Sequence, residues 1–275
     1  MAYIIEREES VGGAVCRIMD DQIVLARAQL TDEKAPIEER VHDARKRFKE
    51  TRALLRLIRE PLGPQYGIEN AWFRDAGRDL AAARDAAAVP AALDSLQLPR
   101  SVTRNVRRHL ANRHSHAPLE GVIANAVDQL VVAQARVALW PPIESSFDAL
   151  AAGLRDNYRK GRRAMAMADS PQTLHEWRKA AKTHWYHVQL LRNVWPEMME
   201  ASAAVLRSLS RALGDHHDLA VLRESIEAPS PRIVEAIDVR QRELERTAFD
   251  IGKRVYAERP DAWLARMRKY WEAWR

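Results

Sequence analysis

The sequence predicts an all-α protein, and three observations support that prediction. Ala, Leu, Arg and Glu, which are all good helix formers, dominate the 275 residues, and only 10 residues are Gly. Almost every long segment repeats its apolar residues with the helical period, and convincing strand alternation is scarce. Most of the 13 prolines fall between these periodic segments, where they end one helix or open the next.

The prolines divide the chain into segments that we expect to be helices. In chain order, the predicted helices cover residues 9–30, 36–60, 66–88, 101–112, 119–139, 144–168, 172–195, 198–225 and 231–273. The prolines at or near their boundaries are Pro36, Pro61, Pro64, Pro90, Pro99, Pro118, Pro141, Pro142, Pro171, Pro196 and Pro231. Pro260 lies inside the last segment and should kink or split that helix, because proline has no backbone N–H to donate.

An internal repeat relates the two halves of the chain. The segment 42–49, HDARKRFK, recurs as HEWRKAAK at 175–182, with an offset of 133 residues. The following helix keeps this offset, since Arg74 and Arg78 correspond to Arg207 and Arg211. Asp85 likewise corresponds to Asp218. We therefore expect two duplicated helical halves, 1–141 and 142–275, joined near Pro141 and Pro142.

Each copy of the repeat places basic side chains along one side of a helix. At about 100° per residue, the basic residues after His42 fall within about 80° of it. These residues form the first stripe: His42, Arg45, Lys46, Lys49, Arg52 and Arg56. Val41, Ala44 and Phe48 fall on the opposite, apolar side.

The corresponding residues of the other half form the second stripe, which is less charged and more aromatic. Its members are His175, Arg178, Lys179, Lys182, Tyr186 and Gln189. Trp177 falls on the apolar side of this helix, and we expect it in the core. The next helix of each half adds the basic pairs Arg74 with Arg78 and Arg207 with Arg211.

The two stripes favour a linear polyanion as ligand. Like charges three or four residues apart destabilise a helix slightly, so ordinary surface helices intersperse acids among them. On the residues alone, we expect no acid in the stripe from His42 to Arg56. Arg offers a fork to phosphate oxygens and Lys a mobile point charge, whereas His adds a donor that a nearby phosphate would keep charged.

Composition limits the alternatives. The net charge of +6 is mildly basic and agrees with an acidic partner. Cys16 is the only cysteine, so no internal disulfide can form, and we expect it to be inert. The first ten residues lack the apolar core of a secretory signal, and the longest apolar runs fall short of the roughly 18 residues of a membrane span. We expect a cytoplasmic protein without a membrane partner.

At the repeated motifs the sequence resembles the CHAD family, the conserved histidine α-helical domain. The hallmark His-x-x-Arg-Lys-x-x-Lys is matched at 42–49 and at 175–182. The segment 213–222, LGDHHDLAVL, resembles the end of the family's later Arg-rich helix. The run 158–163, YRKGRR, resembles the basic segment before the second motif, and it contributes Arg159, Arg162 and Arg163. The resemblance extends from about residue 8 to 273, and the chain resembles a stand-alone member.

The resemblance implies two antiparallel four-helix bundles related by a pseudo-twofold, with a basic groove or channel between them. It implies binding of inorganic polyphosphate, association with polyphosphate granules and a polyphosphate-metabolising enzyme as a partner in trans. We expect the stripes, the two arginine pairs and the three arginines of 158–163 to bind polyphosphate, without a cofactor, a metal or a catalytic residue. The two halves depart from each other at several positions, so we expect them to contribute unequally to binding. The first half has Ala81 and Arg84 where the second has Gly214 and His217, and Trp185 and Gln189 make the second stripe less charged.

Two other functions stay open at this point. Nucleic acid is an alternative ligand because a second basic cluster is present, although no aromatic residues are interleaved there for base stacking. Its members are Arg100, Arg104, Arg107, Arg108, His109, Arg113, His114 and His116. A metal-dependent phosphohydrolase is the other alternative, suggested by the pairs His42-Asp43 and His217-Asp218. The surrounding cations would repel a divalent metal and disfavour this reading.

Overall fold

The computed structural model describes residues 3–82, 88–112 and 119–275, and the regular structure within these ranges is helical, without strands. The all-α prediction is therefore confirmed. The helices are α1 (Val11–Thr31), α2 (Ile37–Leu57), α3 (Arg59–Leu62), α4 (Pro64–Ala82), α5 (Ala88–Ser95), α6 (Arg100–Asn112), α7 (Leu119–Val137), α8 (Asp148–Ala166), α9 (Pro171–Leu190), α10 (Pro196–Ser225), α11 (Pro231–Val255) and α12 (Pro260–Trp274). A 3-10 turn, Arg192–Val194, follows α9.

Capping residues and prolines explain where several helices begin. Ser10 caps α1 by accepting a hydrogen bond from the backbone N–H of Gly13. Ser170 and Thr173 form a reciprocal capping box at the start of α9. Prolines open α9, α10, α11 and α12, where the missing N–H would have no helical partner in any case. As expected, the segment 231–273 is split at Pro260 into α11 and α12.

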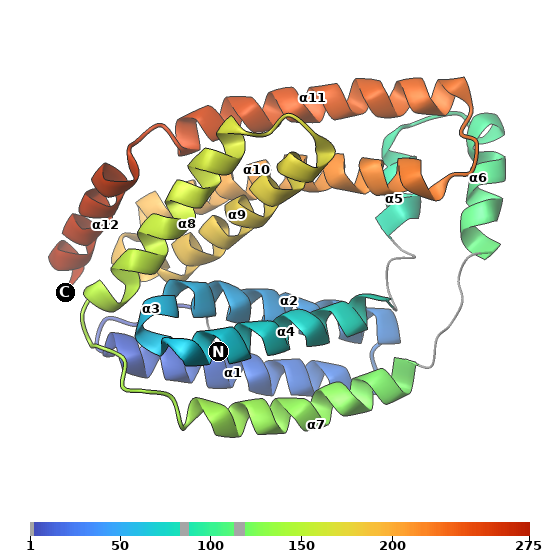
Figure 1. The fold of residues 1–275 in the computed structure, drawn as a ribbon. Helices are drawn as coiled ribbons and strands as arrows, with labels where there is room; N and C mark the ends of the chain where they lie inside the picture. The colour runs from blue at the N-terminus through green and yellow to red at the C-terminus, as the bar shows by residue number, and fades with distance from the viewer. Residues whose placement is uncertain (1–2, 83–87, 113–118) are drawn as a thin grey trace.

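The helices pack in two groups (Figure 1). In the first group, α1 packs against α2 and α7, and α4 packs against α2 and α7. In the second group, α10 packs between α9 and α11, α8 lies against α9, and α12 packs on α8. One continuous hydrophobic core extends through both groups and contains Trp177, which is fully buried as predicted.

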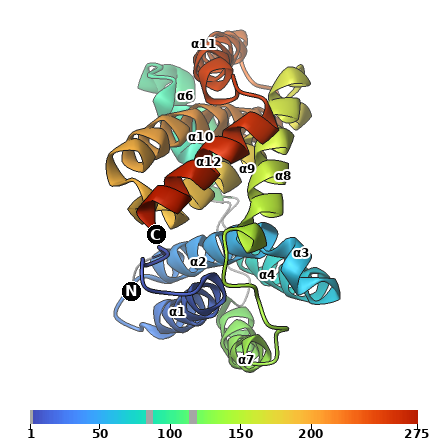
Figure 2. The same cartoon turned by 90° about the vertical axis from the view of Figure 1, so that its left-hand side faces the viewer.

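The two groups meet along α2, which contacts both α8 and α9 (Figure 2). At Gly153 of α8 the backbones approach so closely that a Cβ atom would collide with the carbonyl of Leu57. His187 of α9 donates from Nε2 to the backbone oxygen of Ala53, 2.9 Å away. This contact brings α2 and α9, the helices of the two stripes, side by side.

The segment between α4 and α7 departs from the prediction. It contains a helix that we did not expect, α5, which packs against α10 of the second group. Helix α6 follows and packs against α5 at the same end of the molecule (Figure 1). The predicted helix over 66–88 is present as α4 up to Ala82, and residues 83–87 lie outside the described residues.

None of the helices in the described ranges combines the length and the apolar character that crossing a membrane requires.

Candidate functional site

The first stripe lies on α2 and differs along its length in exposure. His42, Lys46 and Lys49 are exposed, whereas Arg52 and Arg56 are half-buried. Arg52 donates from Nε to Oδ1 of Asn70, 3.2 Å away, and burial together with the charge of Arg56 lowers its pKa to about 10. Holding a guanidinium in such a place is costly unless an anion compensates the charge.

Arg56 reaches the second group of helices. Its Nη1 donates to Oγ1 of Thr183 on α9, 3.4 Å away, and burial lowers its pKa. Together with the contact between His187 and Ala53, this bond fixes the end of the first stripe beside α9. The stripes of the two halves therefore adjoin.

Five predicted site residues gather in one small pocket between α2 and α4, which we call the inner pocket. It has a volume of about 200 Å³, and Phe48, Phe73 and Gly77 contribute its uncharged lining. Its cations are Arg45, Lys49, Arg52, Arg74 and Arg78. Arg74 and Arg78 pair with Asp75, at 2.7 and 3.5 Å, so a ligand would compete with this carboxylate for them.

Lys182 is the most constrained cation of the second stripe. Its Nζ lies 3.8 Å from the centroid of the Trp185 ring, and the guanidinium carbon of Arg207 lies 5.8 Å from the same centroid. Burial, followed by the repulsion of Arg178, lowers the pKa of Lys182 to about 8. Lys46 of α2 and Arg207 of α10 add to this repulsion, so basic residues from three helices converge here.

The prediction that the first stripe contains no acid is wrong. Glu50 lies about 80° from His42 on the helix, and its side chain is buried beneath the stripes. Its Oε2 accepts a hydrogen bond from Arg47 at 2.8 Å. Burial raises its pKa, whereas the charges of Arg47, Lys46 and Lys182 lower it. One carboxylate thus partly compensates the cations of both stripes.

Tyr186, which we expected on the second stripe, is instead buried. Its ring makes an edge contact with Tyr3, with centroids 6.2 Å apart, and another ring contact with Trp185. The hydroxyl of Tyr3 donates to the backbone oxygen of Glu50 at 3.0 Å. The N-terminal segment therefore covers the position at which Tyr186 would have met a ligand.

His175 opens the second stripe beside a second imidazole. Its ring lies against that of His217 on α10, and its Nδ1 is buried without a hydrogen-bond partner in the described part of the chain. Burial, followed by the charges of His217, Lys179 and Arg178, lowers its pKa to about 4. Lys179 forms an ion pair with Glu176 at 2.6 Å. In the second half, Arg207 and Arg211 are exposed on α10.

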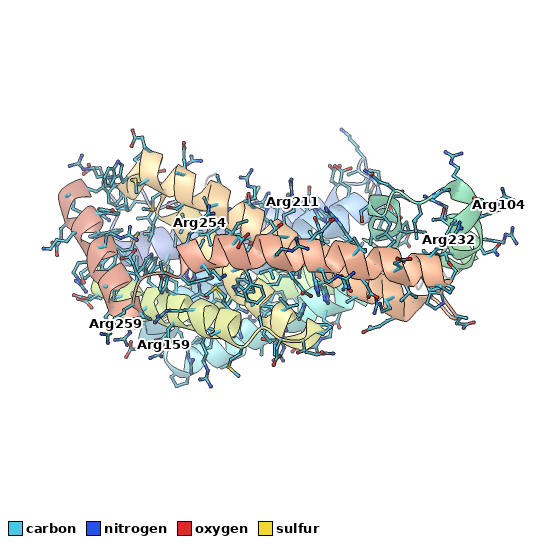
Figure 3. The ribbon with its side chains drawn as sticks, turned by 90° about the horizontal axis from the view of Figure 1, so that it is seen from above. Arg104, Arg159, Arg211, Arg232, Arg254 and Arg259 are labelled. Atoms are coloured by element: carbon cyan, nitrogen blue, oxygen red, sulfur yellow. The ribbon has the colours of Figure 1, made fainter. Side chains whose placement is uncertain are left out.

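The basic segment of α8 extends the site beyond the stripes. Where α8 meets α2, α3 and α4, a junction pocket of about 780 Å³ is lined by Arg56, Arg59, Arg155, Arg159 and Lys160, together with Glu60 and Asp156. Arg159 also lines an outer pocket of about 450 Å³, with Arg162, Arg163 and Lys253. Figure 3 labels Arg159 on α8. Arg56 and Arg159 thus lead from the stripes to the outer face.

Sequence reasoning missed Lys253 and the basic lining of the junction pocket. The run 158–163 contains Lys160, which could have been included with its neighbours. Lys253 adjoins Arg254 near the end of α11, a basic pair that gave a weak signal in the sequence. Only the packing of α11 against α8 brings Lys253 beside Arg162 and Arg163.

The other basic cluster lies elsewhere. Arg104 projects from α6 at the opposite end of the molecule from Arg159 (Figure 3), and Arg107 pairs with Asp94 at 2.5 Å. Among the residues singled out from the sequence, Arg84, Asp85, Arg113, His114 and His116 lie outside the described residues.

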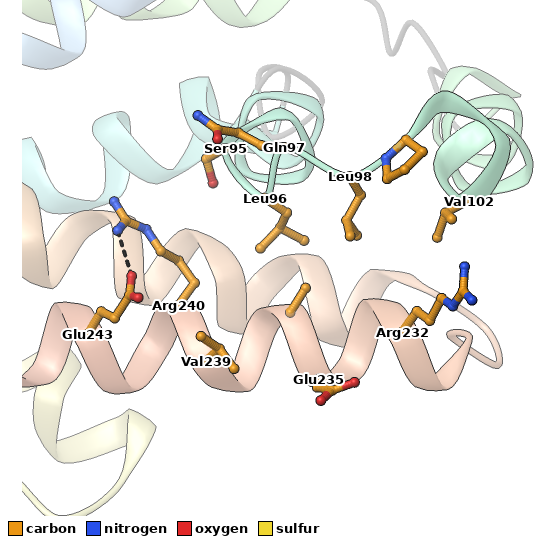
Figure 4. A pocket seen from close by; sticks show the side chains of 12 residues that line it. Ser95, Leu96, Gln97, Leu98, Val102, Arg232, Glu235, Val239, Arg240 and Glu243 are labelled. Carbon is orange, nitrogen blue, oxygen red and sulfur yellow. Dashed lines mark hydrogen bonds and ion pairs between the residues drawn. The ribbon is translucent and has the colours of Figure 1, made fainter.

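A further pocket, of about 690 Å³, lies between the α5–α6 connection and α11 (Figure 4). Its lining is mixed, with Leu96, Leu98 and Val239 beside the ion pair of Arg240 and Glu243. It contains no residue of either stripe.

Within the described ranges, no group of three or more His, Cys, Asp or Glu side chains is placed to hold a metal ion. Basic side chains, not carboxylates, dominate the stripes and the pockets beside them.

Comparison with protein families adds to this geometry. The family model described as the CHAD domain matches residues 21–227, which include both copies of the repeated motif. The chain belongs to the CHAD family. The match confirms the resemblance, and it ends before α11 and α12. The CHAD region thus contains both stripes and the basic segment of α8, whereas Lys253 of the outer pocket lies beyond it. No curated protein matches the chain significantly.

Proposed function

We propose that this CHAD protein binds inorganic polyphosphate along the two stripes. The observation that carries the proposal is the convergence at Lys182, where burial and the neighbouring cations of α2, α9 and α10 lower the pKa of the Lys182 ammonium. Glu50 compensates this charge only in part, so the remaining positive charge is unfavourable in the free protein, and a polyanion would compensate it. The CHAD family is linked in general to polyphosphate binding, which supports this choice of polyanion.

The arrangement of the pockets supports a ligand with many phosphates. Arg52 belongs to the inner pocket, Arg56 to the junction pocket, and Arg159 to both the junction and outer pockets. These three arginines provide consecutive contacts from α2 to the outer face of α8. A flexible linear polyanion can follow such a path, whereas a single phosphate would occupy one pocket only.

We further propose that residues 1–141 and 142–275 are duplicated halves, each built as an antiparallel four-helix bundle. The ends of α2 and α9, Leu57 and Leu190, differ by the 133 residues of the sequence repeat. The contacts correspond as well, because α2 packs on α1 and α4 as α9 packs on α8 and α10. A pseudo-twofold between the halves would bring the equivalent stripes together at the α2–α9 contact.

In this proposal the protein is a binding module and not a catalyst. The stripes supply groups that hold phosphates, and no cofactor is needed for that role. We place its action in the cytoplasm, at polyphosphate granules, with a polyphosphate-metabolising enzyme as a partner in trans. Phosphate release from polyphosphate by the purified protein, stimulated by a divalent metal and abolished by His42→Gln, would contradict the non-catalytic role.

Nucleic acid is the second candidate ligand, favoured by the exposed arginines of α6, Arg100, Arg104 and Arg108. A competition titration separates the two candidates, with immobilised protein and with polyphosphate and single-stranded DNA at equal phosphate concentration. We expect polyphosphate to displace the DNA. Preferential retention of DNA, weakened by Arg104→Gln and unaffected by Lys46→Gln, would instead place the ligand on α6.

A further inference from the structure

A pocket of different character lies on the other side of α9 from the second stripe. It has a volume of about 500 Å³ and is formed by α9, α10, α11 and α12. His184, two residues after Lys182, faces this side because two residues rotate a helix by about 200°. The volume lies in the range of small-molecule sites, and we call this cavity the apolar pocket.

Apolar side chains from four helices form most of its wall. Leu206 comes from α10, and Trp263 and Met267 come from α12; all three are otherwise buried. Val205 of α10, by contrast, is 44% exposed although its side chain is apolar. A ligand with an apolar body would remove this surface from water, which is favourable.

His184 provides an unused polar group in this apolar wall. Its side chain is buried among the rings of Tyr158, Tyr256 and Trp263, and its Nδ1 has no hydrogen-bond partner among the described residues. Burial lowers its pKa to about 3, so the ring is neutral and retains one N–H donor and one lone pair. Buried polar groups without a partner are rare and commonly mark a site that a ligand or water completes.

The charges at the rim favour an anion. Arg266 is occupied, because Glu258 accepts hydrogen bonds from its Nη2 and Nε at 2.5 and 3.3 Å. Arg254 also lines the pocket, and its guanidinium forms no ion pair with a carboxylate in the part of the chain that the structure describes. Figure 3 labels Arg254 near the end of α11. The rim therefore offers one cation that no acid among the described residues neutralises.

We propose that the apolar pocket binds a small amphipathic carboxylate. Its apolar body would lie against Trp263 and Met267, its carboxylate would pair with Arg254, and a polar atom would hydrogen-bond to His184. Polyphosphate does not suit this pocket, because apolar walls would desolvate many charges and offer one free cation in return. The site is separate from the stripes, so this inference is independent of the proposed function.

Isothermal titration with octanoate, and with 1-octanol as a neutral ligand with the same number of carbon atoms, tests the proposal. We expect saturable one-to-one binding of octanoate and weaker binding of the alcohol. Arg254→Gln should weaken octanoate about tenfold, as expected for one charge-assisted contact, and should leave the alcohol unchanged. Arg232→Gln, an exposed position near the start of α11, is the matched control and should change neither affinity.

Filling the cavity provides the second arm of the test. Ser202→Trp places a bulky ring in the pocket and should abolish octanoate binding, while circular dichroism and thermal unfolding report whether the fold is intact. Val205→Trp, at an exposed position of the same wall, replaces it if Ser202→Trp does not fold. Absence of octanoate binding by the parent, or binding that survives the folded tryptophan variant, would overturn the proposal.

Discussion

The imidazole rings of His175 and His217 lie with their centroids 4.1 Å apart and their planes inclined at 33°. The first belongs to α9 and the second to α10. Burial lowers the pKa of both, and repulsion from His217 contributes to the low value of about 4 for His175. The motif histidine of the second half is therefore neutral near pH 7 in the free protein.

This relationship predicts that acid strengthens polyphosphate binding. A phosphate beside His175 would raise its pKa above about 4, so the complex would hold a proton that the free protein lacks. Affinity should rise as the pH falls through the raised value, by at most about tenfold per pH unit for one linked proton. Titrations from pH 8 to pH 5 measure this, and His175→Gln should flatten the dependence. Affinity that falls in acid would indicate a metal-ligand role instead.

Neutralising two cations in either stripe should weaken polyphosphate binding. We expect the double variant Lys46→Gln with Lys49→Gln to lose more affinity for polyphosphate than Arg178→Gln with Lys182→Gln, because the first stripe continues into the inner pocket. The control pair is Lys34→Gln with Arg232→Gln, two exposed cations away from the stripes with the same loss of charge. Equal affinities for all three folded variants and the parent would place the ligand elsewhere.

Salt should weaken binding steeply. By analogy with nucleic acids, the logarithm of the affinity should fall linearly with the logarithm of the salt concentration as counterions are released. Replacing one phosphate-binding Lys or Arg by Gln should reduce the slope by about one. Titrations at four or more salt concentrations with parent and variants measure it, and a flat response would refute electrostatic binding.

Gly153→Ala tests the contact between the two helical groups. The added methyl would meet the carbonyl of Leu57, so α8 must move away from α2. We expect a loss of about 1–3 kcal/mol of stability, as for other overpacked sites, together with weaker polyphosphate binding. Gly67→Ala is the control, because nothing lies within 4 Å of an added Cβ there. Thermal unfolding and titration give the two readouts.

Acid should unfold the protein through two buried histidines. Burial lowers the pKa of His184 to about 3 and that of His187 to about 4, so both rings are neutral in the folded state. In the unfolded chain both imidazoles bind a proton at higher pH than in the folded protein. The free energy of unfolding is therefore highest above the unfolded pKa of histidine, and it falls as the pH drops from that value towards 4. Each contributes a slope of about 1.4 kcal/mol per pH unit within that window. Unfolding free energies at pH 7.5, 6 and 5 should fall accordingly, and His184→Phe should reduce the slope.

The sequence predicted much of the fold because prolines and helical periodicity are local signals. Pro260 splits the last helix as expected. Helix α5 escaped prediction because Pro90 resembles a helix breaker, although proline is tolerated in the first turn of a helix and Pro90 lies two residues after the first described residue of α5. That α5 packs on α10 is a tertiary fact without a local signature.

For the site, residue spacing predicted which cations share a helix face, but not what covers them. When each helix is considered alone, Glu50 falls near the first stripe and Tyr186 falls on the second. Both side chains are buried because α2 and α9 pack together beneath Tyr3. The same packing buries Lys182 and so explains why its pKa is lower than that of an ordinary surface lysine. Contacts between helices decided each of these cases.

The position of α5 has a consequence for synthesis. Its apolar residues Val89, Ala92 and Leu93 are buried in the finished protein, where α5 packs on α10. A growing chain presents α5 about a hundred residues before the ribosome has made α10. The synthesis of the first group, which ends with α7, is completed in that interval, whereas the helix on which α5 packs is still missing. A chain that is cut before α10 would therefore lack the helix against which these apolar side chains of α5 pack.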